Sequence, residues 1–249
     1  MKLEMMQIMS NERIAKGTYE MVLAGEIPHL IEEPGQFIHI KLNDESLPLR
    51  RPISIAAYNE NQLRILYKLV GKGTEKLSEL KKGDSLDVLG PLGNGFKLDN
   101  HLEHKKVLLV GAGIGIAPLY QLACDLQKYQ LDLDIIMSFK SKDEVYYLEE
   151  FKKLGNVYLS TDDGTCGKRG YCKDVIEDLG SDYDYVYACG PLIVLKFVKE
   201  YFVDLDHVYL SLEQRMACGM GACYACDTKD KKKRICKDGP VFNGKEVSL

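Results

Sequence analysis

The sequence predicts a multidomain protein of the β plus α/β class, with an antiparallel β-barrel, a Rossmann-like parallel sheet and a small cysteine-rich segment. Short alternating strands and turn signals fill residues 1–99, which predicts the barrel. Apolar strands alternate with helices over 100–205, which predicts the parallel sheet. Cysteines gather in 206–249, so we expect three domains with these boundaries.

The barrel prediction depends on alternation within short stretches. In QFIHIKL, Ile38 and Ile40 fall on one face, and in QLRILYKLV, Leu63, Ile65 and Tyr67 share a face. The turn signals EEPGQ, VGKGT, KKGDS and GPLGNG separate such stretches. Several short strands at this spacing favour a small antiparallel barrel.

The parallel sheet is predicted by buried strands that lead into helices. VLLVGAG is a continuous apolar strand, and APLYQLACDLQKY follows it as a helix with Pro118 near its first turn. Further strands are expected at LDIIMSF, NVYLS and DYVYAC, with helices at EVYYLEEFKKL and PLIVLKFVKEYF. Strands of this kind predict a sheet that is covered on both faces.

Composition and charge exclude several classes of protein. The net charge of −4 gives no general reason to expect binding to nucleic acid or to a membrane. The longest apolar stretch contains three glycines and a proline, and it is too short to span a bilayer. The start, MKLEMMQIMSNER, does not resemble a signal peptide, so we expect a cytoplasmic protein. Clustered cysteines are more often metal ligands than disulfides in that compartment.

Half of the eight cysteines form a C-x4-C-x2-C-x9-C pattern made by Cys218, Cys223, Cys226 and Cys236. Zinc sites usually show two separated C-x2–4-C pairs, whereas plant-type 2Fe-2S clusters begin with C-x4-C-x2-C. Small residues between the cysteines let a loop wrap around a cluster. The spacing therefore favours a 2Fe-2S cluster, although the x9 gap is short and structural zinc remains an alternative.

A glycine-rich turn in LVGAGIGIAPL indicates a nucleotide site. Gly111, Gly113 and Gly115 follow a buried strand and precede a helix, where backbone amides can approach a phosphate. The pattern differs from G-x-G-x-x-G because the third glycine comes one residue early. A tight strand-to-helix turn without a ligand is the alternative.

Two stretches in the first domain carry further candidate ligand contacts. In LRRPISIAAY, Arg51 offers a fork of donors that suits a pyrophosphate, and Ser54 could bond to a ring nitrogen. In GKGTEKLSEL, Thr74 is a candidate helix N-cap or phosphate donor. The alternatives are solvated arginines beside an edge strand and a simple capped helix.

The order of the motifs resembles the ferredoxin reductase superfamily over about residues 1–205. These motifs are, in chain order, R-P-I-S, G-x-G-T, GPLGNGF, the glycine turn and CGP. The resemblance implies an FAD-binding barrel followed by an NAD-binding domain. It implies FAD contacts from Arg51, Pro52, Ile53, Ser54, Leu66, Tyr67, Lys68, Gly73 and Thr74, and NAD contacts from Gly111, Gly113, Gly115, Cys189, Gly190 and Pro191. Ile53 stands where many relatives have a tyrosine.

With STDDGTCGKRG and the C-terminal cysteines added, the whole chain resembles the electron-transfer subunits of the dihydroorotate dehydrogenase B family. This resemblance implies one FAD and one 2Fe-2S cluster per chain. It also implies an FMN-containing dihydroorotate dehydrogenase catalytic subunit as partner, in a heterotetramer of two plus two chains. Electrons would pass from FMN through the cluster and FAD to NAD+, in pyrimidine (UMP) biosynthesis, and this chain would hold no catalytic residue for dihydroorotate.

Two rival interpretations stay open. The chain could be the FAD and 2Fe-2S small subunit of another complex, a ferredoxin-dependent NADH:NADP oxidoreductase or a sulfhydrogenase. It could also be a zinc-stapled regulatory or adaptor module. Asp162 and Asp163 favour NAD over NADP, because carboxylates repel a 2′-phosphate. We expect Cys166 and Cys172 to be free thiols, and the basic run 229–237 to be a solvated hairpin tip or a docking site.

Overall fold

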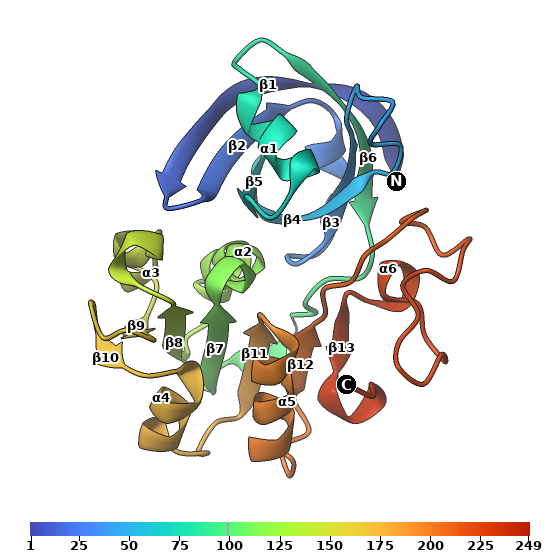
Figure 1. Cartoon of the computed structure of the whole chain (residues 1–249). Helices are drawn as coiled ribbons and strands as arrows, with labels where there is room; N and C mark the ends of the chain where they lie inside the picture. Colours follow the sequence, from blue (N-terminus) through green and yellow to red (C-terminus); the bar gives the residue numbers. More distant parts are fainter. Residues whose placement is uncertain (99) are drawn as a thin grey trace.

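The computed structural model describes residues 1–98 and 100–249, and a closed β-barrel lies beside a larger sheet, with helix α2 (Ala117–Leu126) between them (Figure 1). The barrel order is β1-β2-β5-β4-β3-β6, and each neighbouring pair is antiparallel. The strands are β1 (Lys2–Ala15), β2 (Thr18–Ala24), β3 (Phe37–Lys41), β4 (Arg51–Tyr58), β5 (Gln62–Lys68) and β6 (Ser85–Leu92). The predicted barrel is therefore confirmed.

The alternating residues fill the barrel as predicted. Ile38 and Ile40 of β3 pack with Leu63 and Ile65 of β5 in one core cluster, and all four are buried. Leu77 of helix α1 (Lys72–Glu79) belongs to the same cluster, so this helix covers part of the barrel interior. Removal of these apolar faces from water is the main force that closes the barrel.

The second sheet has the order β10-β9-β8-β7-β11-β12-β13, and its pairs are parallel except the last. The strands are β7 (Lys106–Ala112), β8 (Asp132–Phe139), β9 (Asn156–Thr161), β10 (Lys168–Arg169), β11 (Tyr185–Cys189), β12 (Val208–Ser211) and β13 (Val241–Asn243). Chain order runs outward from β7 through β8 to one edge and from β11 to the other. The sheet therefore has a topological switch point between β7 and β11.

Helices cover both faces of this sheet (Figure 1). Helices α2 (Ala117–Leu126) and α3 (Leu148–Lys152) contribute to the core cluster on the barrel side. Helices α4 (Cys172–Leu179) and α5 (Leu192–Tyr201) contribute to the cluster on the opposite face. Within residues 1–98 and 100–249, no helix has the length and apolar character needed to cross a membrane.

One predicted helix is shorter than the sequence suggested. We expected a helix over 144–154, but α3 begins only after Tyr147, whose φ of 58° lies in the left-handed region. The Tyr147 hydroxyl donates to a Glu20 carboxylate oxygen and accepts from Arg64 Nη1 at 3.1 Å. These barrel contacts hold the tyrosine outside the helix, so tertiary packing overrides local propensity.

Short 3-10 segments complete the connections, and none of them was predicted. They are η1 (Ile27–Leu30), η2 (Asn100–Leu102), η3 (Gly113–Ile116), η4 (Lys142–Glu144) and η5 (Gly244–Glu246). The predicted boundary between the first two domains falls at Asp99, which lies outside the described residues.

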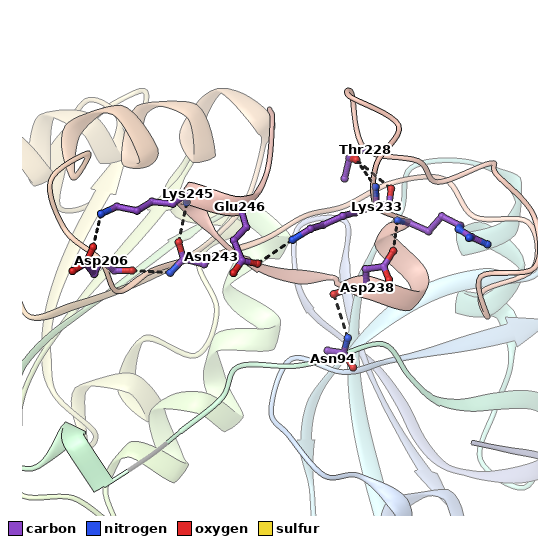
Figure 2. Close-up of polar contacts among 9 residues, drawn as sticks. Asn94, Asp206, Thr228, Lys233, Asp238, Asn243, Lys245 and Glu246 are labelled. Atoms are coloured by element: carbon purple, nitrogen blue, oxygen red, sulfur yellow. Dashed lines mark hydrogen bonds and ion pairs between the residues drawn. The ribbon is translucent and has the colours of Figure 1, made fainter.

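The C-terminal segment, residues 206–249, joins the sheet and the barrel (Figures 1 and 2). It supplies β12, β13 and the short helix α6 (Ile235–Asp238). Asn94, at the end of the barrel, donates to the Asp238 carbonyl at 3.2 Å. Asn243 donates to the Asp206 carbonyl at 2.7 Å, which fastens the segment beside the sheet. The cysteine-bearing loop is thus held on two sides.

Asp184 links the starts of β7 and β11 and gives a pH-dependent prediction. It accepts from the Lys106 backbone N–H and from Lys105 Nζ, both at 2.9 Å. These two contacts lower the pKa of Asp184 below its ordinary value of 3.8. Because the folded pKa is the lower one, the contribution is present above the unfolded pKa and is lost as pH falls through the folded pKa.

We expect Asp184→Asn to lower the urea midpoint at about pH 7 and to have a much smaller effect at about pH 3. The exposed neighbour Asp182→Asn is the control and should change the midpoint little at either pH. An Asp184→Asn effect of equal size at both pH values would contradict this assignment.

Candidate functional site

A cavity of about 430 Å³ lies where the barrel, the sheet and the C-terminal segment meet. It includes most of the predicted FAD residues, which come from β4, β5 and α1. These are Pro52, Ile53, Ser54, Leu66, Tyr67, Lys68 and Thr74. The sheet side contributes Ile114 and Ala117, at the glycine turn. Mostly apolar walls with a few polar groups are typical of a cofactor site.

Arg51 and Gly73 do not line the cavity themselves, but the fold brings them together beside it. A Cβ on Gly73 would lie 2.3 Å from Arg51 Nε, so the guanidinium packs directly over this glycine. Gly73 belongs to the first turn of α1, where backbone amides point outward. A guanidinium over a helix N-terminus is an arrangement that suits a pyrophosphate.

The N-cap role considered for Thr74 is wrong. Gly71 occupies the N-cap position, and Thr74 lies inside the first turn. Its hydroxyl donates to the Gly71 carbonyl at 3.0 Å and accepts from the Val70 N–H at 2.9 Å. The hydroxyl therefore stabilises the turn before the helix.

The glycine turn and the CGP turn meet at the topological switch point of the sheet. Gly111 pairs in register with Cys189, so both turns begin at the carboxyl ends of the neighbouring strands β7 and β11. A Cβ on Gly115 would lie 2.4 Å from the Cys189 carbonyl oxygen and 2.6 Å from the Gly190 nitrogen. The carboxyl ends of parallel strands at such a point are where open α/β sheets bind their ligands. The sequence did not predict that Tyr146 donates to the Gly113 carbonyl at 2.9 Å.

Near the carboxyl ends of these strands, Cys189 and Glu213 have raised pKa values. Complete burial raises the pKa of the Cys189 thiol, and the charge of Glu213 adds to the shift. Glu213 lines the cavity and keeps solvent contact, yet desolvation by the surrounding atoms raises the pKa of its carboxyl. The thiol is therefore neutral near pH 7 and unsuited to act as a nucleophile.

The four predicted ligand cysteines lie in one loop and helix, and their sulfurs form two pairs. Cys218 Sγ accepts from the Cys223 N–H at 3.4 Å, and the two side chains interact. Cys226 Sγ accepts from the Cys236 N–H at 3.4 Å, and these side chains also interact. Among the described residues no three His, Cys, Asp or Glu side chains gather as a single-ion site. Two pairs are the arrangement that a two-iron cluster uses.

Backbone amides favour thiolate in this loop. Desolvation alone would raise the pKa of Cys218, but amide hydrogen bonds from Cys223, Met220 and Ala222 outweigh it and lower the pKa. The Gly221 N–H donates to Cys236 Sγ at 3.1 Å. Burial and the nearby Cys226 raise the pKa of Cys236. Thiolates hold iron–sulfur clusters, and amides aimed at the sulfurs tune their potential, so the residues fit such a group.

His39 lies beneath the cysteine loop. It lies on the outer face of β3, opposite Pro52 of β4, and it is fully buried. A Cβ on Gly219 would lie 2.5 Å from His39 Nδ1, so the loop rests on the imidazole. Burial and the charge of Arg50 lower the pKa of His39 to about 4.

Comparison with protein families identifies this loop. Residues 213–248 match the model described as the iron–sulfur cluster binding domain of dihydroorotate dehydrogenase B. Over its full length the chain is 44% identical to the dihydroorotate dehydrogenase B (NAD(+)) electron transfer subunits of Geobacillus sp. (strain WCH70) and of Fusobacterium nucleatum. Each alignment covers 100% of both chains. The chain belongs to this family. The predicted resemblance to the dihydroorotate dehydrogenase B electron transfer subunits is thereby confirmed.

Solved structures agree with the predicted fold. The structure of an NADH-dependent reduced ferredoxin-NADP oxidoreductase, studied for flavin-based electron bifurcation, superposes with a TM-score of 0.86. It is 31% identical and covers 98% of this chain and 90% of its own. A ferredoxin NADP+ reductase from Neisseria gonorrhoeae with bound FAD and NADP has a TM-score of 0.70 at 15% identity, which shows a shared fold.

Other cavity residues were missed by sequence reasoning. Residues 212–216 follow β12 and form one wall, and Phe37, Val70 and Pro240 add to it. Only the position of 212–216 shortly before the first ligand cysteine could have drawn attention to them. Asp162 and Asp163 follow β9, so they lie at the carboxyl ends of the parallel strands, as Gly111 does.

The cysteines outside the ligand loop are free, including Cys166 and Cys172. The Cys166 N–H donates to Thr161 Oγ1 at 3.1 Å. Burial raises the pKa of Cys172 to about 11. The expectation of free thiols at these two positions is consistent with this environment.

Two glycines of the nucleotide turn should respond differently to the same substitution. In Gly115→Ala the new methyl group would overlap backbone atoms of the CGP turn, so we expect a loss of about 3 kcal/mol in the free energy of unfolding. In Gly113→Ala the site is open and only the positive φ of 58° is penalised, by about 1 kcal/mol. Chemical denaturation of both variants measures the difference, and equal losses would contradict the close contact.

Proposed function

We propose that this chain transfers electrons from a dihydroorotate dehydrogenase catalytic subunit, through a 2Fe-2S cluster and FAD, to NAD+. The observation that carries this proposal is that the candidate flavin cavity has walls in common with both other candidate sites. The candidate flavin cavity touches the glycine turn on one side and Met216, which precedes the cysteine loop, on the other. Three neighbouring cofactor sites are what a relay between hydride and single-electron chemistry requires.

The cavity residues would hold FAD. Pro52, Ile53 and Ser54, which line the cavity, would contact the flavin, and so would the backbone of 66–68. Arg51 and the first turn of α1 at Gly73 would bind the pyrophosphate, because the guanidinium lies directly over this turn. The flavin, when bound, accepts or donates electron pairs as hydride and single electrons in separate steps.

The switch point would hold NAD. Gly111, Gly113 and Gly115 allow the backbone to approach the nucleotide closely, and the turn of Cys189, Gly190 and Pro191 lies beside them. Asp162 and Asp163 at this edge would favour the ribose of NAD over the 2′-phosphate of NADP. The neutral Cys189 thiol would contribute packing beside the nicotinamide.

Cys218, Cys223, Cys226 and Cys236 would hold the cluster, with one pair on each iron. The paired sulfurs and the amide donors in the loop support this assignment. The zinc-stapled adaptor is disfavoured, because the matching family model describes an iron–sulfur domain and the cavity would have no role.

The proposal includes a partner of defined chemistry. Dihydroorotate oxidation belongs to a catalytic subunit, which we infer carries FMN and assembles with this chain as a heterotetramer of two plus two. The names of the relatives, as electron transfer subunits, support the existence of such a partner. A cytoplasmic location, where the ligand thiols stay reduced, forms part of the same proposal.

A second candidate is the small subunit of a ferredoxin-dependent NADH:NADP oxidoreductase. It is supported by the 31% identity and the TM-score of 0.86 to the bifurcating enzyme. The higher identity of 44% to the dihydroorotate dehydrogenase B subunits favours the first candidate. Copurification with a dihydroorotate-oxidising subunit, rather than with an NADP-linked one, distinguishes the two.

We expect the anaerobically purified chain to contain about two irons and about one FAD. In Cys236→Ala the iron should be lost because one ligand is missing, while FAD and NADH-to-dye activity remain. Dihydroorotate-dependent NADH formation with the partner should then disappear. Cys124→Ala, on α2 and away from the loop, is the control and should keep both activities. Zinc in place of iron would refute the proposal.

Arg51→Gln should weaken FAD binding by about tenfold to a hundredfold, because one charge-assisted contact to phosphate is removed. Fluorescence titration of the flavin-free chain with FAD measures the dissociation constant. The adjacent Arg50 pairs with Asp87 at 2.7 Å instead, so Arg50→Gln should affect stability more than FAD affinity. Equal FAD affinity in the wild type and in Arg51→Gln would exclude the pyrophosphate role.

A further inference from the structure

The buried imidazole of His39 lacks a hydrogen-bond partner among the residues that the structure describes. Neither Nδ1 nor Nε2 makes a hydrogen bond to any residue that the structure describes. The backbone groups of Arg50 and Cys218 approach the ring closely enough to raise its pKa, against the effect of burial, but neither completes a hydrogen bond of normal length and angle. An unsatisfied buried polar group costs free energy, and it commonly marks the place of a ligand, ion or water.

The position of the ring indicates what its partner is. Gly219, which rests on Nδ1, directly follows the first ligand cysteine, Cys218. On the strand side, Pro52 faces His39 across the β3–β4 pair and lines the cavity. His39 itself does not line the cavity. The imidazole of His39 is therefore placed to donate a hydrogen bond to a group that the cysteine loop holds.

We propose that His39 is a positioning residue whose ring N–H donates a hydrogen bond to a sulfur of the cluster, at the corner held by Cys218. This inference rests on the proposed function, because it requires the 2Fe-2S cluster. An imidazole in either charge state carries at least one N–H donor, and sulfur accepts such bonds. Hydrogen bonds to cluster sulfurs stabilise the extra negative charge of the reduced state, so the bond raises the reduction potential.

An apolar residue would meet the packing requirement at this position equally well. Along the outer face of β3 the neighbour of His39 is Phe37, which is buried, and its cross-strand neighbour on β6 is Leu89, which packs against the same apolar cluster. A donor role gives the polar ring under Gly219 a purpose that packing alone does not supply. The matched substitutions are His39→Leu, which removes the donor, and His39→Gln, which keeps an N–H group of similar reach.

The test is an EPR-monitored redox titration of the anaerobically purified, cluster-containing chain. At a fixed ambient potential, His39→Leu should lower the ratio of reduced to oxidised cluster about tenfold, which equals about 59 mV for a one-electron centre. His39→Gln should remain within about twofold of the wild type, as should the exposed control His29→Leu. Iron and sulfide are quantified in every sample.

The outcomes separate this inference from the proposed function. A normal iron content with an unchanged potential in His39→Leu overturns the inference alone, and so does an equal shift in His39→Leu and His39→Gln. A wild-type chain without iron and sulfide overturns the proposed function together with the inference.

A second measurement needs no substitution, in case His39→Leu does not fold. The wild-type chain is labelled with 15N-histidine, and the reduced cluster is examined by pulsed EPR. A nitrogen coupling that changes on labelling is expected, because Gly219 of the cysteine loop rests on the His39 imidazole. A spectrum that is unchanged by the label overturns the proposal.

Discussion

The burial of both faces of strand β3 is the constraint on which the rest of the structure depends. Ile38 and Ile40 face the barrel interior, whereas Phe37 and His39 face outward and are equally buried. An antiparallel strand commonly leaves one face in water. Here the outer face is covered by the C-terminal segment, and Phe37 shares a core cluster with Cys226, so barrel and cysteine loop form one hydrophobic unit.

The close approach of these units requires glycine at their junction. Gly93 has a φ of 72°, and a Cβ there would lie 2.6 Å from the Gly239 carbonyl oxygen. The next residue, Asn94, accepts and donates backbone hydrogen bonds with residues 239–241. The end of β6 is thereby joined to the chain that leaves the cysteine loop, and the loop has a fixed distance from the cavity.

Patterns within short stretches of sequence predicted the strands whose burial those stretches determine by themselves. Alternation identified β3 and β5, and continuous apolar runs identified β7, β8 and β11. Strands β12 and β13 were missed because they are short, and their pairing depends on contacts far apart in sequence. The cavity wall at 212–216 and the partnerless ring of His39 were missed for the same reason. The motifs named candidate ligands, but only the packing of three units showed which surfaces face each other.

This packing also bears on how a relay can work without large motions. The cavity wall at Met216 lies in the core cluster that contains Cys226 and Cys236, so the proposed flavin and cluster sites are separated by buried side chains. A dry, closely packed separation gives surrounding dipoles little freedom to rearrange when charge moves. The Tyr147 contacts with Glu20 and Arg64 brace the opposite side of the barrel against α3. With the barrel held on both sides, the two cofactor sites keep one mutual geometry, and only nucleotide and partner need to exchange.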